Sequence, residues 1–315
     1  MRHLSIPASL ILALTSTFSV TAQQPRSTQP AAEPGSRPTV TLLNPGASPR
    51  QLLRIAPRPG TTGVIDLTMR ITAKQLLDGA ETPEPPSPAV LMSFATTVTG
   101  VQGERISYTF ECIRGDLVED PAIPPAILDL MRGGIKMVVG LRGTGVLTNR
   151  AESLGATVTT VPGMDADLLA HAAAIDQLLD QVTTPLPAEP VGVGGSWEVT
   201  NTIKQDGLIV QETITCTLAA SDGNTVRIDM DIRRHADPQP VLDQNMPPGA
   251  SADLSSYAFA GTGRTVLRLD RLHPIEGVIN VTSESTMQMK VGGISHEIVQ
   301  HVTIVTELKG NSPGD

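Results

Sequence analysis

The sharpest candidate for chemistry in this sequence is a group of methionine and histidine side chains near its carboxyl end. Met287 and Met289 share one face of an alternating segment, and a turn at Gly292-Gly293 brings His296 opposite Met289. Thioether sulfur and imidazole nitrogen are soft ligands that suit copper. Methionine also fills irregular β cores, and a single histidine there is commonly held by a hydrogen bond. We therefore expect no metal site, and copper bound by Met287, Met289 and His296 is the alternative.

A second group of polar side chains also shares one face of a segment. Asp229, Asp231, Arg233 and His235 alternate with apolar residues, but acids and bases on an exposed strand are typical of solvated charge. The sequence has no phosphate-binding loop that ends in Gly-Lys-Ser/Thr and no Gly-x-Ser-x-Gly nucleophile turn. We expect no catalytic residues, no cofactor and no enzymatic activity.

Composition narrows the classes of partner. The 315 residues carry a formal net charge of −9, so the clustered basic surface that binds nucleic acid is not expected. Aromatic residues make up only 2% of the chain, which argues against stacking platforms for bases or sugars. With 40% hydrophobic and 17% charged residues, the chain has enough apolar surface to bury a core.

The amino-terminal segment has the pattern of an export signal. Met1-Arg2-His3 supplies positive charge, residues 4–20 are apolar or small, and Val20-Thr21-Ala22 is a small-residue cleavage site. We therefore expect residues 1–22 to be a signal peptide and the protein to be periplasmic or extracellular. No later segment has the 18 apolar residues that a transmembrane helix requires, so we expect no membrane span.

The first part of the mature chain changes from a proline-rich arm to alternating strands. Residues 23–60 contain many prolines and little periodicity, which predicts an extended arm with little structure of its own. Residues 61–162 form a first β-rich half with a short helix, Ile123 to Arg132, which begins at Pro124-Pro125 and ends at Gly133-Gly134. Its strands are expected near residues 63–71, 90–94, 106–112, 137–148 and 156–161.

A long helix leads to the second half. Residues 163–190 hold an amphipathic helix from Asp165 to about Val182 and a proline-rich linker, and residues 191–310 form the second β-rich half. Two turns fix the strand pairing, Asp206-Gly207 and Gly292-Gly293. The expected opposite pairs are Gln205 with Leu208, Ile203 with Val210, Val199 with Ile214, Trp197 with Cys216, Val291 with Ile294, Met289 with His296, Met287 with Ile298, and Val281 with Ile304.

The two halves share a short motif. Gly143-Thr144-Gly145 and Gly261-Thr262-Gly263 each open further strands in this interpretation, which suggests a degenerate internal repeat. The expected fold is mainly β with a few helices: two halves of curved antiparallel sheet joined by the amphipathic helix. Cys112 and Cys216 fall on inward-facing positions, and the sequence leaves open whether they form a disulfide or stay buried thiols.

Three segments carry a resemblance to known proteins: residues 42–50 (LLNPGASPR), residues 187–199 (PAEPVGVGGSWEV) and Gly261-Thr262-Gly263. On these segments the chain resembles a family of uncharacterised exported bacterial proteins, known only as a domain of unknown function. In architecture, its strand-rich halves are similar to the lipoprotein-carrier half-barrels of the bacterial periplasm. The first resemblance implies no catalytic residues, and the second implies a fold without implying a function.

Two functions follow from these expectations. The first is a non-enzymatic protein whose curved sheets bind an apolar ligand, a lipid or a lipidated protein, because aliphatic residues and methionine dominate the inward-facing positions. The alternative is a structural or interaction protein of the cell envelope without a small-molecule ligand. A filled interior would serve folding alone and favour the alternative, whereas surplus inward-facing apolar surface would favour binding.

Overall fold

A computed structural model describes residues 37–83, 87–159, 183–205, 207–242, 246 and 249–311. The expected signal peptide, residues 23–36 of the expected arm and the helix expected at 165–182 lie outside these residues. The single described helix is α1 (Pro125–Lys136). The described strands are β1 (Thr39–Asn44), β2 (Thr62–Leu77), β3 (Ala80–Thr82), β4 (Val90–Gln102), β5 (Arg105–Leu117), β6 (Arg142–Thr148), β7 (Ser153–Val158), β8 (Ser196–Gln205), β9 (Leu208–Asp222), β10 (Thr225–His235), β11 (Gln239–Pro240), β12 (Ser251–Arg268), β13 (Glu276–Val291) and β14 (Ile294–Asn311).

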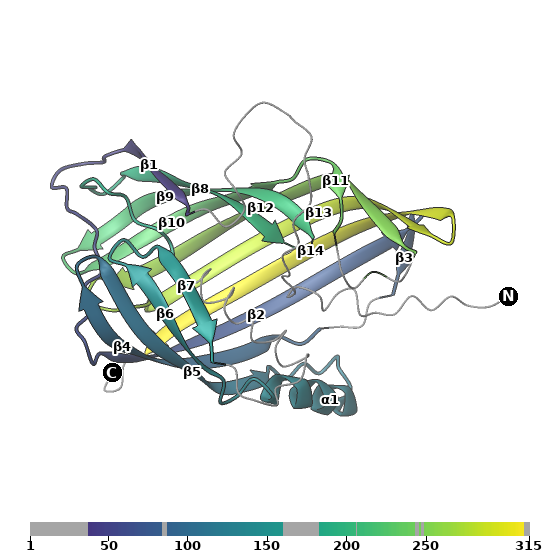
Figure 1. Cartoon of the computed structure of the whole chain (residues 1–315), viewed down its shortest axis with the longest axis horizontal. Coiled ribbons are helices and arrows are strands. Elements are labelled where there is room, and N and C mark those ends of the chain that lie inside the picture. The colour runs from purple at the N-terminus through teal and green to yellow at the C-terminus, as the bar shows by residue number, and fades with distance from the viewer. Residues whose placement is uncertain are drawn as a thin grey trace.

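The described strands form one curved antiparallel sheet of 14 strands that does not close (Figure 1). Its order is β1-β8-β9-β10-β12-β13-β14-β2-β4-β5-β6-β7, with β3 beside β2 and β11 beside β12. The prediction of a mainly β fold is confirmed. Because β14 pairs with β2, the carboxyl-terminal strands continue directly into the amino-terminal ones. The division into two halves joined by a helix is not confirmed.

Both predicted hairpins have the predicted register. Trp197 pairs with Cys216 and Val199 with Ile214 in the β8–β9 hairpin. Met289 pairs with His296 in the β13–β14 hairpin. A shift by one residue would have turned every side chain to the opposite face of the sheet. The turns therefore decide which residues face inward.

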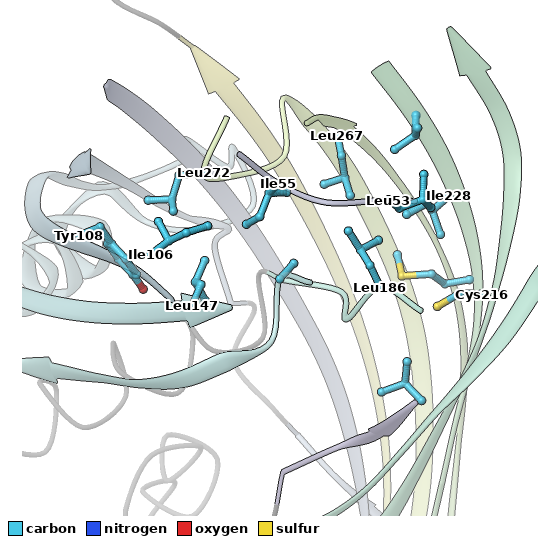
Figure 2. Packing of buried hydrophobic residues seen from close by; sticks show 14 of the residues in the cluster. Leu53, Ile55, Ile106, Tyr108, Leu147, Leu186, Cys216, Ile228, Leu267 and Leu272 are labelled. Carbon is cyan, nitrogen blue, oxygen red and sulfur yellow. The ribbon is translucent and has the colours of Figure 1, made fainter. Parts of the chain in front are cut away.

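The inward-facing side chains at one end of the sheet form a core that segments outside the strands complete. Leu53, Ile55, Leu186 and Leu272 lie between Tyr108 and neighbouring residues on one side and Cys216 and Ile228 on the other (Figure 2). Leu53 and Leu186 are fully buried. We call this region the filled end; it comprises these covering residues and the strand residues that they contact.

The segment around Leu53 connects parts of the sheet that are distant in strand order. The Ile55 amide donates to the carbonyl of Asn149, just after β6, over 2.8 Å, and the Ala56 amide donates to the carbonyl of Leu269, just after β12, over 2.6 Å. The prediction of an arm with little structure of its own is therefore wrong for residues 37–60, which contain β1 and part of the core. Periodicity did not reveal this role, because Leu53 and Ile55 are buried without lying in a strand or helix.

Two further contacts hold the covering segments. The Trp197 indole Nε1 donates to the carbonyl of Pro185 over 2.9 Å in a fully buried position. The Arg54 guanidinium donates to the carbonyls of Pro187 and Ala188 over 2.9 and 2.7 Å. Burial lowers the pKa of Arg54, followed by repulsion from Arg150. The bonds to Pro185 and Pro187 satisfy the carbonyls of buried residues, which would otherwise be costly to leave unpaired.

The helix and the strands around it differ in their bounds from the prediction. Helix α1 continues through Gly133-Gly134 to Lys136 because Ile135 packs with Leu117, Ile123 and Leu128. Tertiary packing thus outweighs the helix penalty of two glycines, about 1 kcal/mol each. The strand expected from residue 137 begins at Arg142, and the one expected at 156–161 is β7 (Ser153–Val158).

The repeated Gly-Thr-Gly motif creates space for large neighbours. Gly145 lies opposite Tyr108, and a Cβ at this glycine would overlap the tyrosine ring. Gly263 lies opposite Met230, and a Cβ there would come within 2.7 Å of its Cε. The second motif lies inside β12, which begins at Ser251, so the prediction that it opens a strand is wrong. Both copies have the same packing role.

Candidate functional site

One row of inward-facing residues changes from apolar to polar as it crosses the sheet. The row runs through Ala73, Val302, Ser283, Phe259, Arg234, Glu212 and Asn201. The next row towards the filled end is apolar and consists of Ile71, Ile304, Val281, Gly261, Ile232, Ile214 and Val199. The polar residues therefore border an apolar face on the same concave side.

Arg234 is the centre of the polar side of this row. Its Nε donates to Glu212 Oε2 over 2.6 Å and its Nη1 donates to Gln205 Oε1 over 2.8 Å. The guanidinium also lies over the ring of Phe259, 4.5 Å from the centroid. The side chains of Arg234 and Glu212 are only 13% and 14% exposed. Because desolvation offsets much of the attraction in such a pair, we interpret it as a fixed polar feature rather than a source of stability.

Asn201 adds an unsatisfied acceptor beside this pair. It lies opposite Glu212 on β8, and its Oδ1 is buried with no hydrogen-bond partner among the described residues. Most buried polar side-chain atoms in proteins have a partner, so an exception needs an explanation. This oxygen could accept a hydrogen bond from an N–H or O–H group of a ligand.

The apolar side of the row is less covered than the filled end. We define the central band as the inward-facing residues Ile71, Ala73 and Gln75 of β2, Ser283 and Ser285 of β13, and Gln300, Val302 and Ile304 of β14. All of them are half-buried. Their equivalents nearer the filled end, such as Leu67 and Leu308, are buried. The central band is thus an apolar surface with polar flanks that the described chain covers only in part.

The structure brings together the residues of the copper alternative. Met289 lies opposite His296, and Met287, on the same face, lies opposite Ile298. All three side chains are half-buried. The imidazole is also held from the β2–β3 turn, because His296 Nδ1 lies 2.7 Å from Asp78 Oδ2. The expectation that no metal binds there stays a prediction.

The alternating charged face is engaged in exposed pairs. Asp229 accepts from Arg264 over 2.8 Å, Asp231 from Arg233 over 2.9 Å, and His235 contacts Asp237 at 3.1 Å. In the described part of the chain, no group of three or more His, Cys, Asp or Glu side chains could hold a metal ion. These contacts support the interpretation of this face as solvated charge.

Both cysteines are free thiols in the core of the filled end. Burial raises the pKa of Cys216 to about 12, and burial also raises the pKa of Cys112. Thiols in this state are poor nucleophiles, because the reactive form is the thiolate. Of the two alternatives left open by the sequence, the structure has the buried thiols.

A small cleft lies where the ends of β2 and β14 meet the segment 271–275. Its cavity volume is about 30 Å³, and Thr62, Thr96, His273 and Asn311 help to line it. A cavity of this size holds water-sized molecules but no acyl chain. The ring nitrogens of His273 are buried without partners among the described residues, and Tyr108 meets the ring edge-on at 5.6 Å. Burial lowers the pKa of His273 to about 3, so the ring is neutral at physiological pH.

Sequence reasoning missed the Arg234–Glu212 pair although a signal was present. In β10, Val226, Ile228, Met230 and Ile232 are buried at alternating positions, and the next position of the same parity is Arg234. Ile214 leads in the same way to Glu212, and the hairpin register places the two opposite each other. Extending both patterns by two residues would have found the pair. No comparable signal pointed to His273, which follows β12 in a loop.

No family model matches this sequence, and no curated protein matches it either. Both resemblances therefore remain predictions. Of the helical segments that the structure describes, none is long and apolar enough to cross a membrane. The proposed function therefore rests on the geometry of the sheet and on the sequence.

Proposed function

We propose that this protein is an exported, non-enzymatic binding protein that holds an apolar molecule on the concave side of its sheet. The ligand is a lipid or the lipid chain of a modified protein, and it lies on the central band. The observation that carries this proposal is the half-buried state of Ile71, Val302 and Ile304 beside a fully covered apolar core. Apolar surface gains about 25 cal/mol for each Å² removed from water, so an acyl chain on these side chains would be stabilised.

The polar flank of the central band suits the other end of an amphiphilic ligand. Phe259 separates the aliphatic residues from Arg234 and Glu212, whose charges neutralise each other at 2.6 Å. Asn201 offers a buried oxygen that accepts no hydrogen bond from the described residues. A hydroxyl or amide group at the head of a lipid would supply the missing hydrogen-bond donor. The row thus changes from apolar to polar along its length, as an amphiphilic ligand does from its acyl chain to its head group.

The remaining parts of the proposal follow from the sequence. A signal peptide at residues 1–22 would place the protein in the periplasm or outside the cell, where lipids and lipidated proteins occur. The net charge of −9 disfavours a nucleic-acid partner. We infer no enzymatic role, because Arg234 and Glu212 are engaged with each other and both cysteine thiols are protonated.

The filled end favours a second candidate function. Here chain segments, rather than a ligand, cover the concave side, with Leu53, Leu186 and Leu272 between the strands (Figure 2). If residues of the chain cover the central band in the same way in solution, the protein has a structural or interaction role in the envelope and no small-molecule ligand.

Mass spectrometry of the protein, purified from its native host without delipidation, tests the proposal. We expect a lipid or lipidated peptide in organic extracts, at about one molecule per protein. A matched preparation of an unrelated exported protein controls for carry-over. Recovery of no stoichiometric lipid from folded protein would favour the structural role instead.

A further inference from the structure

We propose that Met287, Met289 and His296 form a copper(I) site at the tip of the β13–β14 hairpin, with Asp78 orienting the histidine. The sequence alone favoured a core role for these residues. Asp78, which lies far from them in the chain, changes that balance. The proposal is independent of lipid binding on the central band.

The contact with Asp78 determines which ring nitrogen of His296 is free to bind a metal. Asp78 Oδ2 lies 2.7 Å from Nδ1 of the imidazole, and Asp78 Oδ1 accepts from the Glu297 amide over 2.8 Å. A carboxylate oxygen accepts hydrogen bonds, so this contact places an N–H of the imidazole on Nδ1. The lone pair that can bind a metal is then on Nε2.

This arrangement is typical of histidines that bind metals. Such a histidine usually donates its other ring N–H to a carboxylate or carbonyl, which fixes its tautomer and its orientation. The Asp78 contact is supported by a second bond, because the Asp78 amide donates to the Glu297 carbonyl over 2.8 Å. The imidazole is therefore held in place before any ion binds.

The methionines supply the remaining ligands. Residues directly opposite each other on antiparallel strands have Cβ atoms about 4.5–5.5 Å apart, which applies to Met289 and His296. Met287 is the next inward-facing residue of β13, and diagonal neighbours are about 7–8 Å apart, within reach of a long side chain. Two thioethers and one imidazole are soft, neutral ligands, and such a set suits copper(I) better than zinc or copper(II). The Asp78 carboxylate would balance the positive charge of the ion.

The position of the site allows an ion to enter. The His296 side chain is 34% exposed, and the hairpin turn at Gly292 and Gly293 lies a few residues away. His301 offers a matched comparison on the same strand. It also contacts a carboxylate, Glu284 at 3.2 Å. His301 lies on the opposite face of the sheet from His296 and the two methionines. A histidine–carboxylate pair without methionine neighbours is thus present in the same molecule.

Titration with copper(I) under anaerobic, reducing conditions against a chromogenic copper(I) chelator tests this inference. We expect one equivalent to bind with a dissociation constant below about 1 μM. Met289→Leu, which keeps the size of the side chain, should weaken binding at least tenfold, and Asp78→Asn should weaken it by about 10–100-fold. His301→Gln should bind as the wild type does. Circular dichroism shows whether each variant is folded.

Two results would overturn the inference. One is that the wild type binds copper(I) no more tightly than a variant that carries both Met287→Leu and Met289→Leu. The other is binding that His301→Gln weakens as much as Met289→Leu does.

Discussion

The filled end and the central band lie on the same concave side, are built by the same kind of alternating strand, and differ in what covers them. At the filled end, Leu53 and Leu186 from segments outside the strands complete a closed core (Figure 2). Over the central band, Val302 and Ile304 stay half-buried. Strand patterning therefore determines which side chains face inward, whereas the covering segments determine whether they belong to a core or remain available to a ligand.

The largest difference between the two regions should appear when an aliphatic side chain is shortened. Leu53→Ala should lower the free energy of unfolding by about 2–5 kcal/mol, because it leaves a cavity in a closed core. Val302→Ala should lower it by about 1 kcal/mol or less, since its side chain is already partly hydrated. Urea denaturation followed by tryptophan fluorescence measures both. Equal losses would show that the central band is covered as completely as the filled end.

A second comparison is between Gly145 of the repeated motif, which contacts a large side chain, and Gly133 of α1, which does not. Gly145→Ala should lower the free energy of unfolding by about 1–3 kcal/mol, because the new Cβ overlaps the Tyr108 ring. Gly133→Ala in α1 has no atom within 4 Å of the new Cβ and should raise it by up to about 1 kcal/mol. Thermal denaturation of the two variants is sufficient. A neutral Gly145→Ala would contradict the packing role of the motif.

His273, which contacts Tyr108 of the filled end, should make the free energy of unfolding fall at acid pH. Its pKa is about 3 in the folded protein against 6.5 in the unfolded chain, so below pH 6.5 the unfolded chain binds a proton that the folded protein does not. Stability should therefore fall by up to about 1.4 kcal/mol per pH unit between pH 6.5 and about 3. Denaturation between pH 7 and 4.5 isolates this effect, because carboxyl groups with lowered pKa values, such as Asp78, act mainly below their unfolded value of 3.8.

A variant sharpens this prediction. His273→Phe keeps an aromatic ring against Tyr108 and removes the titrating group, so most of the loss between pH 6.5 and 4.5 should disappear. If the variant and the wild type lose stability equally over this range, His273 is not the source of the acid sensitivity.

Much of the sheet could be predicted from the sequence, because two-residue turns and alternation are local signals. They fixed the pairing of Trp197 with Cys216 and of Met289 with His296. The candidate sites were harder to find. Arg234 required the inward parity to be followed past the last apolar residue. The contact of Asp78 with His296, like the burial of Leu53, depends on pairing between distant parts of the chain, for which no local pattern exists.

The most direct test of ligand binding on the central band is titration with an environment-sensitive apolar dye. Val302→Glu places a charge on the band, and Thr303→Glu places the same charge on the next residue, which is exposed on the opposite face of β14. Val302→Thr is a milder variant of nearly the same size in case the charged one does not fold. We predict saturable binding by the wild type and Thr303→Glu, at least tenfold weaker binding by Val302→Glu because burying a charge is costly, and an intermediate value for Val302→Thr. Equal binding by all four folded proteins, or no saturable binding by the wild type, would contradict the account.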